Sequence, residues 1–441
     1  MIKTPIDDFV RAYAEGDTLR MHMPGHKGNG EIEKYDLTEI KGADSLYSAD
    51  GIIKESETIA SMIFGSYTFY STEGSSHAIR AMLYLALVGA RAAGKSAKIL
   101  AGRNAHKVFL SAVAMLDLDC EWLSAGDDYM SCNITPEILS SKLDEMDEMP
   151  MAVYVTSPDY LGNMLDISAL AEVCHERGIL LLVDNAHGAY LKFLTKSKHP
   201  IDLGADMCAD SAHKTLPTLT GGAYLHISPS LDKSYREGAK RSLELFGSTS
   251  PSYLILASLD RTNRFLVEHK QFFPGIASVI RSTKYRLVEM GYSLLGLEQL
   301  KISISTREYG YDGNELAEIL RENGIECEFS DSDHIVFMPS PLNPNGVRVL
   351  EASLSAIPKK DPLPTAKPAS LTPMTLLSIR EATMSPAETL PIEECVGKIV
   401  AAADVSCPPA VPILMPGELV EPEHVEILRR YGKEHLTVVK E

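Results

Sequence analysis

One lysine in the sequence stands where an amine could do chemistry. Lys214 follows Ser211, Ala212 and His213 directly after a short apolar segment, so we expect it at the end of a strand. A lysine amine that is partly withdrawn from water has a lowered pKa and can act as a nucleophile. The hydroxyl of Ser211 and the imidazole of His213 could hold a phosphate while Lys214 binds an aldehyde of the same molecule, a combination that describes pyridoxal phosphate (PLP). The alternative is a solvated surface lysine.

An acidic side chain lies about 30 residues before this lysine. Asp184 closes an apolar run at 179–183, which follows a segment with helical character at 168–177 and an earlier apolar run at 152–156. This order predicts a βαβ unit with Asp184 at the carboxyl end of a buried parallel strand, where open α/β sheets bind ligands. A carboxylate there could keep the pyridine nitrogen of PLP protonated and complete an electron sink. The alternative is that Asp184 caps a helix.

The residues after Asp184 favour the cofactor interpretation. The sequence continues Asn185-Ala186-His187-Gly188. The small side chain of Ala186 would let a ring lie flat, and His187 could reach oxygens of the ring or of a substrate.

A third segment is typical of a phosphate site. A strand at about residue 68 leads into Glu73-Gly-Ser75-Ser76, and a helix is expected at 78–93. The backbone N–H groups and the dipole at a helix N-terminus favour an anion, so we assign Ser75 and Ser76 to the cofactor phosphate. The alternative is an ordinary serine N-cap. Because an acid beside a phosphate is unfavourable, Glu73 must face away or meet a cation.

Several ordered motifs together closely resemble the Orn/Lys/Arg decarboxylase family. They are Asp184-x-Ala-His-Gly, Ser211-x-His-Lys and the proline-rich tail at 408–418, and residues 20–28 are similar to that family's amino-terminal signature. The resemblance covers nearly the whole chain and is to the short form of the family. It implies an α/β, PLP-dependent transferase fold: an aspartate-aminotransferase-like large domain with a mainly parallel central sheet, plus a smaller α/β C-terminal domain.

The resemblance and the residue pattern together predict the organisation of the chain. We expect an N-terminal arm at 1–30, a large PLP-binding domain with linking helices at 31–297, and a small C-terminal α/β domain at 298–441. Long helices are expected from residue 253 to about 297. In the last part we expect strands at 301–306, 325–329 and 334–338, and helices at 314–323 and 345–356.

The resemblance also implies a reaction and partners. The chain is expected to use PLP to decarboxylate arginine, lysine or ornithine to the corresponding amine and carbon dioxide. The short form favours arginine, which gives agmatine, and thereby a role in polyamine biosynthesis. The family builds its site between two subunits, so a homodimer or a higher homo-oligomer is expected.

The resemblance assigns a role to one further histidine. Arg103-Asn104-x-His106-Lys107 matches a family motif at a strand end, and His106 is expected to stack on the pyridine ring and to help deliver a proton to the substrate α-carbon. Residues 248–253 resemble a segment that touches the phosphate across the dimer interface; a helix start with Pro251 in its first turn is the simpler explanation. The candidate catalytic residues are therefore Lys214, His106, His187 and Asp184, and the candidate cofactor-binding residues are Ser75, Ser76, His106, Asp184, Ala186, His187, Ser211, His213 and Lys214.

The sequence departs from the family pattern at five positions. Relatives usually carry Asn at Glu73 and another small or polar residue at His77, often Gln at Gly221, and Tyr and Gly at Cys407 and Ala410. Two alternatives stay open. Arg380 could clamp a substrate carboxylate, as aminotransferases require. The departures at Glu73 and Gly221 leave open a non-catalytic relative that only binds PLP or a partner.

Composition narrows the class of partner. The 441 residues carry a net charge of −18, which disfavours nucleic acid and an anionic membrane and suits a small cationic amino acid. The segment around Asp7 and Asp8 lacks the apolar core of a signal peptide. The 7 cysteines are scattered without a Cys-x-x-Cys pair, which indicates the cytoplasm and no zinc cluster. His22 and His26 flank a Pro-Gly turn, so no metal site is expected there either.

Overall fold

The computed structural model describes residues 2–123, 129–364, 373–403, 405 and 409–440. Contacts divide the chain into two compact units. The first unit consists of Met1–Ser96, Met151–Val153 and Ile167–Gln271, and the second of Ala97–Pro150, Tyr154–Asp166 and Phe272–Glu441. The expected boundaries near residues 30 and 297 stay a prediction.

The first unit contains the strands that precede the candidate site residues. Its complete strands are β1 (Tyr67–Ser71), β5 (Leu180–Asp184), β6 (Met207–Asp210) and β7 (Ala223–Ile227). Its helices are α1 (Pro5–Glu15), α2 (Ile52–Phe64), α3 (Gly74–Ala92), α6 (Ile167–Glu176), α7 (Ala212–Thr215), α8 (Lys233–Phe246) and α9 (Tyr253–His269).

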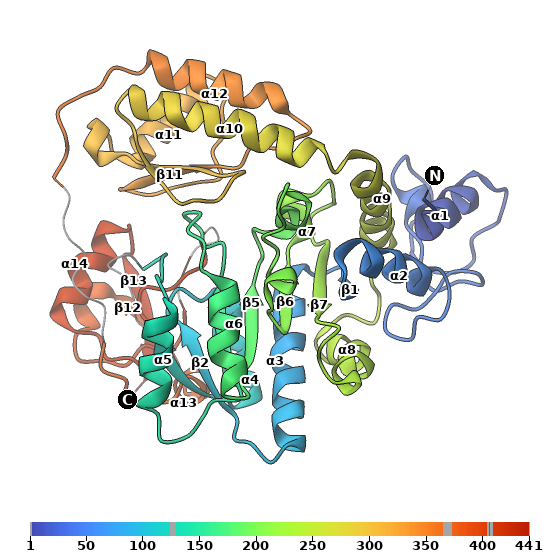
Figure 1. Cartoon of the computed structure of the whole chain (residues 1–441), viewed down its shortest axis with the longest axis horizontal. Helices are drawn as coiled ribbons and strands as arrows, with labels where there is room; N and C mark the ends of the chain where they lie inside the picture. Colours follow the sequence, from blue (N-terminus) through green and yellow to red (C-terminus); the bar gives the residue numbers. More distant parts are fainter. Residues whose placement is uncertain (1, 124–128, 365–372, 404, 406–408, 441) are drawn as a thin grey trace. The chain divides into compact units, whose positions relative to one another are not determined.

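Strands β5, β6 and β7 are buried because their side chains are almost continuously apolar. Every residue of β6 and β7 is buried, the pattern of strands that are covered on both faces. Strand β5 runs parallel to β6, with Asp184 opposite Ala209, whereas β7 runs antiparallel to both β6 and β1. Helix α3 packs against β6, β7 and α8 (Figure 1). The Asp184 and Lys214 segments therefore leave two neighbouring parallel strands at the same edge.

The second unit contains the remaining elements. Its strands are β2 (Lys98–Gly102), β3 (Asp119–Leu123), β8 (Ser293–Leu295), β9 (Ile302–Ser305), β10 (Phe329–Ser330), β11 (His334–Phe337), β12 (Ala387–Pro391) and β13 (His435–Val439). Its helices are α4 (Lys107–Leu116), α5 (Pro136–Asp144), α10 (Phe272–Glu289), α11 (Gly313–Glu322), α12 (Pro344–Ala356), α13 (Ile379–Met384) and α14 (Pro422–Arg430).

The second unit holds two small antiparallel sheets. One has the order β10-β11-β9-β8, and helices α10 and α12 pack side by side next to it (Figure 1, yellow and orange). The other pairs β12 with β13 over a buried cluster that includes Val400, Leu414 and Val438. This part of the chain is the expected smaller α/β arrangement.

The central sheet confirms the expected fold class. Together with β4 (Ala152–Thr156), the strands have the order β1-β7-β6-β5-β4-β2-β3. The pairs β5–β6 and β2–β3 are parallel, and β7 is the antiparallel strand. The expected βαβ unit is present as β4, α6 and β5, and helices accompany the sheet in α/β fashion.

Some expected boundaries were wrong. Helix α3 begins at Gly74 and not at residue 78, so Ser75 and Ser76 lie within its first turn. Pro251 precedes the N-cap Ser252 of α9 and is not in the helix. Helix α10 ends at Glu289, where a turn at Gly291 with φ +93° redirects the chain into β8.

The strand expected at 325–329 is reduced to Phe329–Ser330. The backbone N–H groups of Asn323 and Ile325 donate to the carbonyl of Leu320, so these residues close the end of α11 and are not available for a sheet. Within the described ranges, no helix combines the length and apolar character needed to cross a lipid bilayer.

Candidate functional site

Asp184 ends β5 with a buried carboxylate. Its side chain is 3% exposed and accepts a hydrogen bond of 3.1 Å from the backbone N–H of Ala186. Asn185 donates its backbone N–H to the carbonyl of Ala209 on β6, at 3.0 Å. The next helical turn, Ala189–Phe193, has Gly188 as its N-cap, so Asp184 does not cap it. The loop after β5 is thus held along β6, with an acid at its start.

Lys214 meets the histidine of this loop. It lies in the single-turn helix α7 directly after β6, and its Nζ is 2.9 Å from Nε2 of His187. His187 is 5% exposed and Lys214 is half-buried. The structure therefore brings together two of the predicted catalytic residues, in surroundings that exclude much of the water.

Two of the predicted phosphate ligands also lie together. The hydroxyl of Ser211 donates to that of Ser75 at 2.8 Å, which places the turn after β6 beside the first turn of α3. Ser76 lies in the same first turn and is half-buried. Nδ1 of His213 hydrogen-bonds the carbonyl of Gly222 at 3.0 Å, so a phosphate contact of this ring would use Nε2.

Glu73 is directed away from this first turn. It is the N-cap residue of α3, but its side chain makes no capping hydrogen bond. Its Oε1 accepts instead from the backbone N–H of Ser248 at 2.7 Å. The side chain thus leaves the N-terminal amides of α3 available to another anion. Glu73 therefore faces away from the expected phosphate site, as one of the two expectations required.

His77 is a structural residue of α3. Its Nε2 donates to the carbonyl of Leu243 at 2.6 Å, so Nδ1 is the acceptor toward the hydroxyl of Ser71, 2.9 Å away. Burial lowers the pKa of His77, although the bond to Leu243 opposes the shift. A neutral imidazole here ties α3 to α8 and to β1.

Comparison with known proteins identifies the chain at this point. The model of the Orn/Lys/Arg decarboxylase major domain matches residues 4–286, and that of the C-terminal domain matches residues 370–433. The chain belongs to the Orn/Lys/Arg decarboxylase family. Its reaction class is therefore the decarboxylation of a basic amino acid, and membership implies PLP as the cofactor.

Individual relatives match this family member over most of their length. The arginine decarboxylase of Halalkalibacterium halodurans is 28% identical, over 99% of this chain and 95% of its own. The arginine decarboxylase of Bacillus subtilis is 28% identical, over 97% and 93%. The solved lysine decarboxylase of Francisella novicida has a TM-score of 0.79 at 17% identity, over 100% of this chain and 81% of its own, which shows the shared fold.

The residues of the first unit fit PLP chemically. The half-buried amine of Lys214 would hold the aldehyde carbon, and the buried carboxylate of Asp184 would hold a protonated ring nitrogen. The hydroxyls of Ser75 and Ser211, which already touch each other, would face the phosphate at a helix N-terminus that Glu73 does not occupy. Each of these roles is a prediction that the observed placement supports.

In the second unit, two decarboxylase motifs from distant parts of the chain meet. The guanidinium of Arg103 donates to both carboxylate oxygens of Glu418, with Nη2 2.8 Å from Oε2. The backbone N–H of Lys107 donates to the carbonyl of Ala410 at 2.8 Å. His106 is the N-cap of α4, where its Nδ1 accepts from the backbone N–H of Val108. Its role toward the cofactor stays a prediction, and Cys407 and Pro408 lie outside the described residues.

Arg380 does not have the environment of a substrate clamp. Its Nη1 donates to the carbonyl of Ala114 at 2.6 Å and its Nε is 3.6 Å from Asp117, so it closes the C-terminal end of α4. The aminotransferase alternative is therefore set aside, in agreement with the family. His22 and His26 hydrogen-bond Tyr13 and Asp36, respectively.

Sequence reasoning missed the polar network behind the loop. Nδ2 of Asn185 donates to Oδ1 of Asp210 at 2.7 Å, and the carboxylate of Asp210 is fully buried. The signal was present, because Asp210 is an acid at the end of an otherwise apolar strand.

Proposed function

We propose that this chain is an arginine decarboxylase, which converts arginine to agmatine and carbon dioxide. The near full-length match to arginine decarboxylases is the observation that supports this choice of substrate. The contact between Lys214 and His187 supports the PLP chemistry and does not distinguish the three amino acids. The solved lysine decarboxylases contribute the fold alone and do not favour lysine.

Lys214 and His187 are proposed to share one mobile proton. At 2.9 Å, with both groups drawn back from water, either nitrogen can donate to the other. When His187 holds the proton, the amine of Lys214 keeps its lone pair and can attack an aldehyde. When Lys214 holds it, the amine can return a proton to a nearby carbon or oxygen. The pair can thus change its protonation without exchange with bulk water.

Asp184 is proposed to fix the position and protonation of the ring nitrogen. When bound, PLP supplies the electron sink that takes up the pair left as the bond from the α-carbon to the carboxylate breaks. The bond from Ala186 N–H holds the Asp184 side chain at the start of the loop. Because the carboxylate is buried, its interaction with a cationic ring nitrogen is little screened by solvent.

The serines are proposed to orient the cofactor through its phosphate. Ser75 is carried by α3 and Ser211 by the turn before Lys214, so one anion bound to both would join these two elements. The amide groups of the first turn of α3 add donors without the cost of ordering a flexible side chain. His106 is proposed to cover the face of the ring, as its motif implies.

The substrate test uses the purified protein with PLP and each of arginine, lysine and ornithine. Carbon dioxide and the product amine are measured together, with Lys214→Ala as the matched inactive control. We expect arginine to give the highest kcat/KM, by about tenfold or more, which corresponds to about 1.4 kcal/mol of transition-state discrimination. A higher kcat/KM for lysine or ornithine would replace the proposed substrate, and a keto acid product would reject decarboxylation.

We further propose that the active form is a homodimer or a higher homo-oligomer and that it works in the cytoplasm. The proposal of an oligomer follows from the family pattern. The proposed cytoplasmic location is supported by the scattered cysteines and the charge of the chain. Light scattering of the purified protein would test the assembly, and a monomer with full activity would contradict it.

A further inference from the structure

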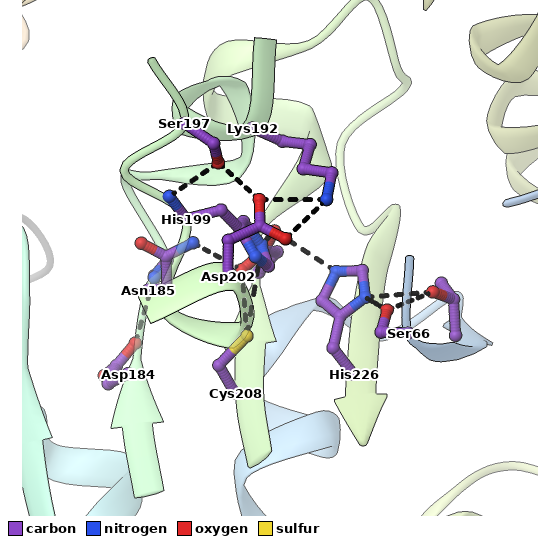
Figure 2. A network of polar contacts seen from close by, with 12 residues as sticks. Ser66, Asp184, Asn185, Lys192, Ser197, His199, Asp202, Cys208 and His226 are labelled. Atoms are coloured by element: carbon purple, nitrogen blue, oxygen red, sulfur yellow. Dashed lines mark hydrogen bonds and ion pairs between the residues drawn. The ribbon is translucent and has the colours of Figure 1, made fainter. Parts of the chain in front are cut away.

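Three potential metal ligands meet in the interior of the first unit, outside the proposed PLP site. They are His199, Cys208 and Asp210, and each is 0% exposed. Figure 2 shows the polar network around them, with dashed lines that run from the Cys208 sulfur toward the side chain of His199. Their ligand atoms all lie within 4.8 Å of one another.

The local sequence explains this convergence. Cys208 and Asp210 are alternate residues of β6, so their side chains point to the same face of the strand. His199 is the N-cap residue of the 3-10 turn Pro200–Leu203, which directly precedes β6. Pro200 disfavours helical backbone at His199, the residue before it, and His199 is extended with φ −68° and ψ 135°.

The distances between ligand atoms suit one cation. Nε2 of His199 is 3.0 Å from Oδ2 of Asp210, and the Cys208 sulfur is 4.0 Å from that Nε2 and 3.9 Å from Oδ1 of Asp210. Ligands at the usual bond lengths of tetrahedral zinc are about 3.3–3.7 Å apart. We propose that His199, Cys208 and Asp210 bind one divalent cation of the zinc type. Thiolate, imidazole and carboxylate together select such a borderline metal over magnesium or calcium.

A neighbouring histidine gives an independent indication. Nε2 of His226 is 0% exposed and lies 3.2 Å from Oδ2 of Asp210, yet it has no hydrogen-bond partner among the described residues. Its other nitrogen, Nδ1, is held by the hydroxyls of Ser66 and Thr68 at 3.1 and 3.0 Å. Ligands of one metal approach each other in this way, close but not aligned as donor and acceptor. His226 is the candidate for the fourth position.

The charges balance when the metal is present. A divalent cation with the carboxylate of Asp210, the thiolate of Cys208 and neutral imidazoles is neutral as a unit, so its burial carries little desolvation cost. Binding releases the thiol proton of Cys208 to solvent. The competing explanation is a hydrogen bond between His199 and Asp210, with Cys208 as a buried thiol that donates weakly to Oδ1 of Asp210.

The metal would restrict the motion of the loop that follows β5 and carries His187. Asp210 also accepts from Nδ2 of Asn185, the residue between Asp184 and Ala186. A cation on Asp210 would therefore fix the end of β6 and the loop that carries Asp184 and His187. This role is structural and does not depend on the proposed substrate.

The test is the metal content of protein made without a histidine tag. The chain is expressed in minimal medium with zinc or with cobalt, passed through a short gel filtration in chelator, and analysed by mass spectrometry for metals. We expect about one equivalent per chain, together with a near-ultraviolet thiolate-to-cobalt charge-transfer band in the cobalt form. In Cys208→Ala and His199→Gln, metal content should fall about tenfold or more.

Cys174→Ala is the matched control, because Cys174 is also a fully buried cysteine of the first unit but is not one of the three ligands. It should keep the metal and the band. A wild-type protein with less than about a tenth of an equivalent and no cobalt band would overturn the proposal in favour of a metal-free hydrogen bond between His199 and Asp210, even if the variants fail to fold. Metal that persists in a folded Cys208→Ala would place the ion elsewhere and also overturn it.

Discussion

The substitution Gly221→Ala tests how the phosphate site is built. The carbonyl of Gly221 accepts a hydrogen bond of 2.7 Å from the backbone N–H of Gly74, the first residue of α3. Gly221 has φ +96°, and a Cβ atom there would lie 2.8 Å from the carbonyl oxygen of Thr72 and 3.1 Å from Cδ1 of Ile255. A side chain at this position must therefore displace backbone that leads directly to Ser75.

The magnitude follows from two separable costs. A non-glycine residue with positive φ costs about 1–2 kcal/mol. Forcing atoms into packed surroundings costs about 1–3 kcal/mol more, and here the atom in the way is a backbone oxygen that cannot rotate aside. We expect Gly221→Ala to lower the free energy of unfolding by about 2–5 kcal/mol. Because the turn that carries Ser75 is displaced, the Kd for PLP should rise about tenfold or more, which is about 1.4 kcal/mol.

Gly94→Ala is the matched control. Gly94 has φ +68°, but nothing lies within 4 Å of the added Cβ, so only the backbone cost of about 1–2 kcal/mol applies. Urea unfolding of both variants gives the difference in stability, and PLP fluorescence during titration of the apoprotein gives the Kd. Equal unfolding midpoints for the two variants, or an unchanged PLP Kd in Gly221→Ala, would refute this reasoning.

Three further predictions concern single residues. Asp184→Asn should retain PLP but lower kcat by about 100-fold or more, because the ring nitrogen loses its anionic partner; near-normal turnover would remove Asp184 from the mechanism. His187→Gln should lower kcat and shift the pH dependence of kcat, since Lys214 loses its 2.9 Å proton partner; an unchanged pH profile would contradict the shared proton. Burial raises the pKa of Asp260, which accepts from the backbone N–H of Ile6, to about 6. The folded protein therefore binds this proton more tightly than the unfolded chain, and stability should fall by up to about 3 kcal/mol as pH rises from about 4 to about 6. Urea unfolding at the two pH values measures this decrease, and Asp260→Asn should lack it. The same pH dependence in the wild type and the variant would contradict the role of Asp260.

The features that depend on local pattern were predictable from the sequence. The short apolar run before Asp184 predicts a buried strand, and β5 does end at this residue. The run at 152–156 became β4 with the expected bounds. Lys214 follows β6 as expected because a short apolar strand must end where polar residues begin.

The contacts between segments were not predictable in the same way. The sequence alone does not predict that His187 contacts Lys214 or that Ser211 contacts Ser75. Each contact depends on how β5, β6 and α3 pack against one another. The buried carboxylate of Asp210 was also missed. Its partners come from two loops and from strand β7, and no single spacing in the sequence joins them. The scattered cysteines argue against a Cys-x-x-Cys zinc cluster, but a site with a single cysteine ligand leaves no such spacing in the sequence.

The central claim is that Lys214 is the covalent anchor of PLP in this decarboxylase. The most direct measurement is borohydride reduction of the purified protein, which makes the bond between a lysine amine and PLP permanent, followed by digestion and mass spectrometry of the peptides. We predict a single pyridoxyl group, on Lys214. A pyridoxyl group on another lysine, or protein-bound PLP that leaves no modified peptide, would contradict the account.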